Sequence, residues 1–104
     1  MTEEHVVRWK NRPADADGSG VTRRRLEGAG AALVRVEVPA GARAAEHAHP
    51  HEQFVEVLAG AGTLVTAAGE RAFGTGDAFH FPAGTRHSAA FDEDTVLLEI
   101  NVGA

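Results

Sequence analysis

Short runs in which apolar and polar residues alternate recur along the chain from residue 31 onward. In residues 33–38, Leu-Val-Arg-Val-Glu-Val, the side chains of Val34, Val36 and Val38 lie on one face of an extended chain. Similar runs separated by Gly and Pro predict further strands over residues 54–58, 63–66, 71–73, 77–81 and 95–102. No segment combines a helical repeat with end caps. The expected fold class is therefore all-β, a sandwich or barrel of short strands.

The N-terminal part of the chain has a different character. Residues 11–20 are rich in Gly, Pro, Asp, Asn and Ser, which favour turns, and they predict a loop. The apolar residues within 6–9 predict a short strand that could pair with a neighbouring subunit. We therefore expect an N-terminal arm over residues 1–30, and a single barrel domain over residues 31–104.

The composition of the chain excludes several classes of binding partner and of functional site. The chain has 104 residues, enough for one domain, and its 15 acidic and 10 basic residues give a net charge of −5. This balance argues against nucleic acid or an anionic membrane as the main partner, because both require a basic surface. The absence of cysteine excludes disulfides, thiolate metal sites and cysteine nucleophiles. No apolar run is long enough to span a membrane and no signal peptide is recognisable, so we expect a cytoplasmic protein.

Histidines are concentrated in one segment. Five of the six lie between residues 47 and 87, three of them in the segment His47-Ala48-His49-Pro50-His51. Residues two apart on an extended chain point to the same side, so the imidazoles of His47 and His49 can meet at one metal ion. Imidazole suits zinc, nickel, copper and iron, and two or three histidines with an oxygen ligand form open catalytic sites. The alternative is a polar turn at Pro50, which is what we expect for His51.

The residues around these histidines form two spaced blocks. The first contains Gly41, His47, His49, Gln53 and Gly60, and the second contains Gly76, Pro82, Gly84 and His87. In this order and spacing they resemble the two sequence motifs of the cupins. Gln53 stands where the family usually has Glu, and Phe91 stands where it has Asn. The resemblance covers residues 31–102 and implies a cupin double-stranded β-helix, a jelly-roll barrel with a metal near its axis.

By position, the resemblance implies that His47, His49, Gln53 and His87 bind a divalent transition metal, which could be Zn, Ni, Fe, Mn or Cu. An amide oxygen does not neutralise the charge of the ion as a carboxylate would. The ion would therefore polarise a bound carbonyl or water more strongly, and the site should bind the ion less tightly. Glu52 is the rival oxygen ligand, although strict alternation turns it away from the face of Gln53.

The alternation of residues along the strands gives further candidate site residues, and each of them also has a purely structural interpretation. The resemblance favours a lumen-facing His80 that could transfer a proton; the alternative is a surface residue between two core phenylalanines. If Glu99 and Asn101 face the lumen, Glu99 is a candidate general base and Asn101 a candidate substrate-binding residue; otherwise both are solvated. Arg35 could bind a substrate carboxylate, or it could form a surface ion pair. We interpret the three arginines at 23–25 as a solvated strand end.

Among small cupins, residues 47–53 resemble the pectin-degradation type, which converts unsaturated uronates into linear keto sugars. In that type a carboxylate at the position of Glu99 is thought to move the proton. The resemblance implies a metal-dependent Lewis-acid isomerase, cyclase or lyase acting on a small oxygenated substrate, such as a sugar acid or a keto compound. The alternatives are a non-catalytic ligand-binding cupin and a non-haem iron dioxygenase. Because small cupins usually form dimers, we also expect a homodimer, with no nucleic-acid or membrane partner.

Overall fold

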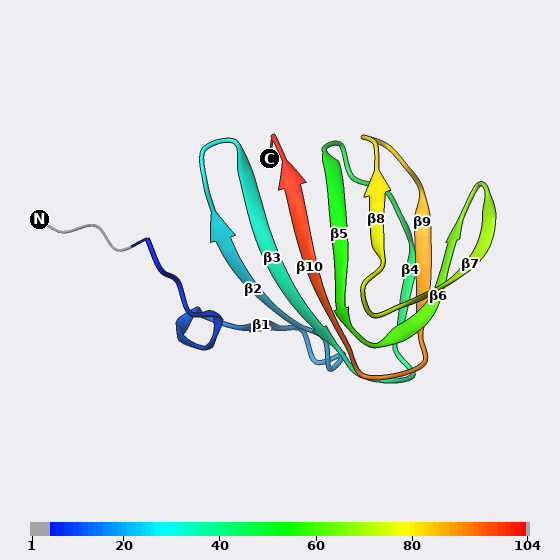
Figure 1. The fold of residues 1–104 in the computed structure, drawn as a ribbon, viewed down its shortest axis with the longest axis horizontal. Coiled ribbons are helices and arrows are strands. Elements are labelled where there is room, and N and C mark those ends of the chain that lie inside the picture. The colour runs from blue at the N-terminus through cyan, green and yellow to red at the C-terminus, as the bar shows by residue number, and fades with distance from the viewer. Residues whose placement is uncertain (1–4, 104) are drawn as a thin grey trace, which may run out of the picture.

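Ten strands in two antiparallel sheets make up most of residues 5–103, which are the residues that the computed structural model describes (Figure 1). The elements are η1 (Trp9–Asn11), β1 (Asp15–Ala16), β2 (Thr22–Glu27), β3 (Ala31–Val38), β4 (Arg43–His47), β5 (Glu52–Ala59), β6 (Ala61–Thr66), β7 (Gly69–Gly74), β8 (Ala78–Phe81), β9 (His87–Phe91) and β10 (Thr95–Val102). The larger sheet has the order β1-β2-β3-β10-β5-β8, and the smaller has the order β4-β9-β6-β7. The expected all-β class is confirmed.

The larger sheet is organised around β10, which pairs with β3 on one side and with β5 on the other. Glu99 of β10 lies between Val34 and Val55, and Asn101 lies beside Gln53. Alternate residues of a strand point to opposite faces of the sheet. Val34 and Val55 belong to the buried core, so these polar residues of β5 and β10 share the inner face with it.

The inner faces of the two sheets form one hydrophobic core. Its buried members are Val34, Val36, Val38, Val55, Val57, Phe73, Phe81, Phe91 and Leu97. In the smaller sheet the ring of Phe73 meets that of Phe91 edge to face, with centroids 5.9 Å apart. Burying one valine or phenylalanine side chain stabilises a fold by about 1.5–3 kcal/mol. The core therefore fixes which face each strand turns inward.

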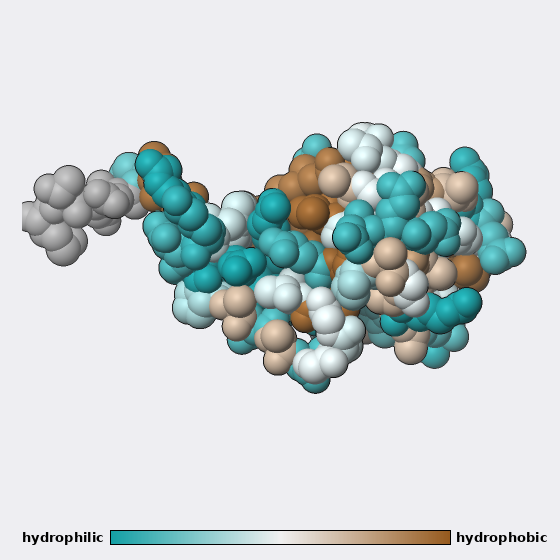
Figure 2. Space-filling model, turned by 90° about the horizontal axis from the view of Figure 1, so that it is seen from below, coloured by the Kyte–Doolittle hydropathy of each residue, from teal (hydrophilic) through white to brown (hydrophobic). Residues whose placement is uncertain are grey.

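The outer face of the larger sheet also carries apolar side chains. Leu33, Ile100 and Phe54 lie in one row across β3, β10 and β5 on this face. Phe54 and Leu58 are 41% and 39% exposed. Figure 2 shows hydrophobic groups gathered on the barrel beside the projecting N-terminal segment. We call this patch the outer apolar face; the ring of His80, from β8, stacks on its Phe54.

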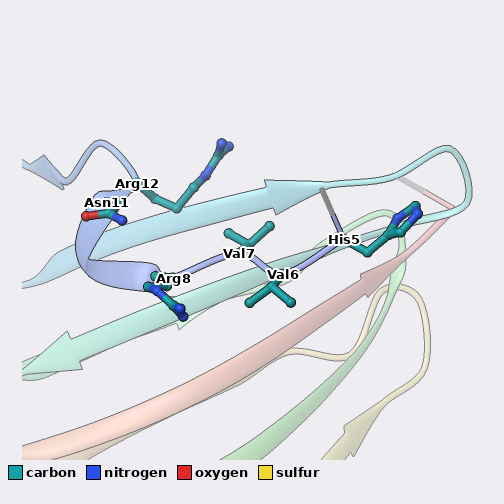
Figure 3. A pocket seen from close by; sticks show the side chains of 6 residues that line it. All are labelled: His5, Val6, Val7, Arg8, Asn11 and Arg12. Carbon is teal, nitrogen blue, oxygen red and sulfur yellow. The ribbon is translucent and has the colours of Figure 1, made fainter. Parts of the chain in front are cut away.

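The N-terminal segment projects from the barrel (Figure 1), and the strand expected over residues 6–9 is not formed within this chain. The segment is irregular up to the 3-10 turn η1 and borders a groove of about 620 Å³ (Figure 3). The Arg12 Nε atom donates a 2.9 Å hydrogen bond to the carbonyl of Arg25 and so attaches this segment to β2. Residues 1–4 and 104 of the predicted arm and barrel lie outside the described residues.

The expected strands are present as β3, β5, β6, β7, β8 and β10, but β1, β2, β4 and β9 were not predicted, and β1 lies within the expected loop over residues 11–20. The sequence of β2, Thr-Arg-Arg-Arg-Leu-Glu, has charged residues on both faces, so it shows no apolar alternation. Backbone pairing with β3 makes it a strand, and residues 22–27 of the predicted arm thereby extend the larger sheet. In residues 5–103 no helix is long and apolar enough to cross a lipid bilayer.

Candidate metal centre

Three histidines from two neighbouring strands and a loop meet at one end of the barrel. His47 ends β4 and pairs in register with His87, the first residue of β9. His49 follows in the loop before β5, and its carbonyl accepts a 2.8 Å hydrogen bond from the amide of Gly84. One ligand atom of each histidine lies within 4.8 Å of those of the other two. No other group of three or more His, Asp or Glu residues within 5–103 gathers in this way.

Backbone carbonyls hold two of these imidazoles in place. The Nδ1 atom of His47 lies 2.7 Å from the carbonyl oxygen of Ala45, and Nδ1 of His87 lies 3.0 Å from that of Thr85. A carbonyl only accepts hydrogen bonds, so each Nδ1 carries the proton and each Nε2 has a free lone pair. The ring of His87 also stacks on Phe81, with centroids 3.9 Å apart. Such support orients an imidazole as a metal ligand.

The local environment lowers the pKa of two of these histidines, His49 and His87. Burial lowers the pKa of His49 below its ordinary 6.5, and the nearby His47, His51 and His87 lower it further. Burial also lowers the pKa of His87, with a smaller opposing effect from the carbonyl of Thr85 and a further lowering from His47. Neutral imidazole is the form that binds a metal, so these lone pairs are available at neutral pH.

Gln53 is the buried polar residue on the inner face beside this end of the barrel. It is 3% exposed, and its Nε2 atom donates a 2.9 Å hydrogen bond to Oδ1 of Asn101, which is 9% exposed. Because this bond occupies the nitrogen end of the amide, the carbonyl Oε1 is the atom that remains for a ligand. Asn101 also faces inward, and in this structure its side chain orients Gln53.

A cavity of about 60 Å³ in the barrel interior borders His47, His87 and Gln53. It is lined by Ala44, His47, Gln53, Val55, Leu64, Phe79, Phe81, His87, Ala89, Phe91, Leu97 and Glu99. Most of this wall is apolar, and Glu99 is its one carboxyl group. The cavity is far below the several hundred Å³ of a pocket that encloses a drug-sized ligand. It therefore has room for an ion and a few atoms, and not for a whole sugar-sized molecule.

Glu99 has the environment of a proton acceptor. Burial raises the pKa of its carboxyl group above the usual 4.5, while Arg23, Arg25, His47 and His51 act in the opposite direction. A carboxylate is a more effective general base when its pKa lies closer to the working pH. The apolar wall of the cavity is therefore what makes Glu99 suitable for proton transfer.

Residues 34–102 match the family model described as the cupin domain. This chain belongs to the cupin family. The match covers most of β3 and all of β4 to β10, and thus all three histidines and Gln53. The resemblance of the two sequence blocks to a small single-domain cupin is confirmed.

Several solved structures have the same fold. An RmlC-like cupin from Shewanella frigidimarina superposes with a TM-score of 0.88 at 23% identity, over 98% of this chain and 93% of that one. KdgF from Halomonas sp. gives a TM-score of 0.83 at 24% identity, over 91% of each chain. The polyketide cyclase RemF from Streptomyces resistomycificus gives 0.81 at 21% identity, over 100% of this chain and 81% of that one. These confirm the jelly-roll fold, and no curated protein matches this cupin.

His80 lies on the outer face of the sheet, so the expectation that it faces the lumen is wrong. Phe79 and Phe81 line the cavity instead. The Nε2 atom of His80 lies 2.7 Å from Oε2 of Glu52, and its ring stacks on Phe54 with centroids 4.7 Å apart. Alternation must expose either the histidine or both phenylalanines, and burying two aromatic rings is more favourable. His80 therefore does not line the cavity.

Arg35 also lies on the outer face, and the expectation that it binds substrate in the barrel is wrong. Its neighbours Val34 and Val36 are 1% and 2% exposed, so the strand turns Arg35 away from the interior. The Nε atom of Arg35 lies 3.8 Å from Oε1 of Glu37 on the surface. The alternative interpretation, a surface ion pair, describes this residue.

The two residues before Gln53 are not part of the histidine cluster. Glu52 points outward to His80, as alternation along β5 predicts, so it does not compete with the Gln53 oxygen. The ring of His51 stacks on His49 with centroids 5.0 Å apart. Its Nε2 atom is buried without a hydrogen-bond partner among the described residues.

The three-histidine group can bind a metal ion, and its donors fit a divalent transition metal. Imidazole nitrogens and an amide oxygen are donors that zinc, nickel, iron, manganese and copper all accept, so the donors alone do not select one of them. The fit rests on two observations: the ligand atoms converge, and Nε2 is the free nitrogen of both His47 and His87.

Proposed function

We propose that this cupin binds a divalent transition metal through His47, His49, His87 and the Oε1 atom of Gln53. We further propose that it is a Lewis-acid isomerase, cyclase or lyase. Its substrate would be a small oxygenated molecule, a sugar acid or a keto compound. The observation that carries the proposal is that a half-buried carboxyl group, Glu99, borders the same small cavity as His47, His87 and Gln53.

The bound ion would supply positive charge that polarises a carbonyl or hydroxyl oxygen of the substrate. The protein's own part is proton transfer: an Oε atom of Glu99 accepts a proton from carbon or oxygen and returns it at a neighbouring position. Phe79, Phe81 and Leu97 line the wall and limit the access of water to that proton. A neutral Gln53 in place of a carboxylate leaves the positive charge of the site undiminished.

The structural neighbours support this class of reaction without defining the substrate. RemF is a polyketide cyclase with the same fold, so the cupin barrel can host chemistry that rearranges oxygenated carbon skeletons.

Proton transfer can be tested without knowing the natural substrate. Metal-loaded protein is incubated in deuterated water with a panel of uronates and 2-keto acids, and proton NMR follows the loss of C–H signals next to the carbonyl group. We expect exchange above the buffer rate with at least one compound, and a loss of 100-fold or more in Glu99→Gln, the scale of general-base catalysis. His80→Gln, on the outer face, is the matched control and should retain the activity.

Other outcomes separate the alternatives. Turnover that requires Fe(II) and O₂ would indicate a non-haem iron dioxygenase. Saturable binding without exchange or turnover, unaffected by Glu99→Gln, would indicate a ligand-binding cupin. Either result would contradict the proposed proton transfer.

We also propose that the protein is a homodimer in which a second copy covers the outer apolar face. Phe54 and Leu58 expose about two fifths of their surface there, beside Ile100 and Leu33 of the same sheet. Contiguous apolar patches on small proteins mark interaction sites. A self-complementary sheet face is the kind of surface that twofold dimers use. A small-molecule substrate and a cytoplasmic location complete the proposal.

A further inference from the structure

The three consecutive arginines of β2 are divided between two faces of the sheet. In the pairing of β2 with β3, Arg23 lies beside Val36 and Arg25 lies beside Val34. Both valines belong to the buried core, so Arg23 and Arg25 are on the inner face and Arg24 is on the outer face. The run is therefore more than a solvated strand end, because two of its members face the side of the sheet that carries the site.

The two inner-face arginines lie close to Glu99. Arg25, Val34 and Glu99 occupy one row across the neighbouring strands β2, β3 and β10. Strands in a sheet are about 4.8 Å apart, so two strand spacings separate the backbones of Arg25 and Glu99, a gap that two long side chains can bridge. In agreement, the charges of both Arg23 and Arg25 act on the Glu99 carboxyl group.

Charge pairing distinguishes these arginines from their neighbours. On the outer face, Oε1 of Glu37 lies 3.4 Å from Nη1 of Arg24 and 3.8 Å from Nε of Arg35. Within residues 5–103, neither Arg23 nor Arg25 forms an ion pair, and the side chain of Arg25 is exposed. Two positive charges on the inner side of the sheet thus have no carboxylate partner of their own at ion-pair distance.

We propose that Arg23 and Arg25 bind the carboxylate of the substrate, while its reacting end enters the cavity beside Glu99. This inference rests on the proposed function and assigns to β2 the role expected for Arg35. The cavity of about 60 Å³ leaves most of a sugar-sized molecule outside, where a second contact is needed. A net charge of −5 repels anions elsewhere on the protein. A guanidinium group can hold a carboxylate through two parallel hydrogen bonds.

The test compares two sugars that differ only at C6. D-galacturonate carries a carboxylate there and D-galactose carries a hydroxymethyl group. Amide NMR shifts are titrated with each sugar on the zinc-loaded and the chelator-treated protein, in wild type, R23Q, R25Q and R24Q. Arginines keep their charge without a metal, so the preference for galacturonate should persist in the chelated protein. We expect R23Q and R25Q each to weaken galacturonate binding by about tenfold, the scale of one charge-assisted contact, and to leave galactose unaffected.

R24Q is the matched control, because Arg24 is the adjacent residue on the opposite face and should leave both affinities unchanged. Equal affinity of wild type for the two sugars, or equal losses for both sugars in R25Q, would overturn the inference. If R23Q is not folded by circular dichroism, R25Q alone decides, since the exposed Arg25 side chain is not needed for the core. Absence of zinc uptake would contradict the proposed function but not this inference, which the chelated protein tests separately.

Discussion

The side-chain amide of Gln53 donates a 2.9 Å hydrogen bond to Asn101, and both residues are buried on the inner face of the larger sheet. The two residues are 48 positions apart in sequence and face each other because β5 and β10 pair in register. The bond occupies the nitrogen end of the Gln53 amide and leaves its carbonyl oxygen free for the ligand role that we propose.

Removing this support should weaken metal binding although Asn101 itself binds no metal in our proposal. We expect Asn101→Leu to raise the dissociation constant for zinc by about 10- to 100-fold, the usual effect of losing a hydrogen bond that orients a ligand. Competition with a chromophoric chelator measures it. Asn101→Asp retains an oxygen that accepts the hydrogen bond from Gln53, so its zinc affinity should fall less. Wild-type affinity in Asn101→Leu would show that the orientation of Gln53 does not matter.

The metal-free protein should lose stability on acidification below about pH 6.5. The folded-state pKa values of His49 and His87 are lowered, so the unfolded chain binds protons that the folded chain does not. The free energy of unfolding therefore falls as pH falls through this region. Urea unfolding of wild type and His87→Gln at pH 5.5 and 7.5 tests this. We expect the decrease to be larger in wild type.

Glu99 changes the free energy of unfolding with pH in the opposite direction. Its folded-state pKa is raised, so its stabilising effect is lost as pH rises. The variant comparison removes this contribution, since Glu99 is present in both proteins. An identical pH dependence in wild type and His87→Gln would contradict the lowered pKa of His87.

Gly60 occupies a position where both backbone conformation and space exclude a side chain. Its φ angle is +109°, and an added Cβ would collide with the buried Thr95. Gly69 has a similar φ angle, +106°, but an added Cβ there would meet open space. We expect Gly60→Ala to lower the unfolding free energy by about 1–3 kcal/mol more than Gly69→Ala, the usual cost of overpacking. Equal losses in thermal or urea unfolding would show that the collision is relieved at no cost.

A charge on the outer apolar face should prevent dimerisation. We expect wild type to have twice the 10.9 kDa chain mass in light scattering, and Phe54→Glu to have the mass of one chain, because a buried unpaired carboxylate is costly. Glu56→Gln, on the same face, is the control for a change in charge and should remain dimeric. A monomeric wild type, or a dimeric Phe54→Glu, would contradict this interface.

Sequence patterns predicted those parts of the structure that depend on local alternation. Val34, Val36 and Val38 placed β3 with its valines inward, and the same rule turned Gln53 in and Glu52 out. The spaced glycines and histidines identified the family because they occur in two ordered blocks.

Errors arose where a functional expectation competed with burial. His80 was expected inside the barrel, but the phenylalanines on either side of it take the interior because their burial is more favourable. Arg35 was expected to reach substrate, although alternation with buried valines already turns it outward. The inner-face position of Arg23 and Arg25 was not predicted, because it depends on the pairing of β2 with β3, which no local pattern in that segment indicates.

The most direct test of the metal centre is the metal content of purified, untagged protein, measured by elemental mass spectrometry. Wild type is compared with His49→Ala, Gln53→Ala and the outer-face control His80→Ala. We expect near-stoichiometric transition metal in wild type and His80→Ala, a reduced content in Gln53→Ala, and none in His49→Ala. Wild type that contains no metal and takes up none of zinc, nickel, iron, manganese or copper on titration would contradict the account.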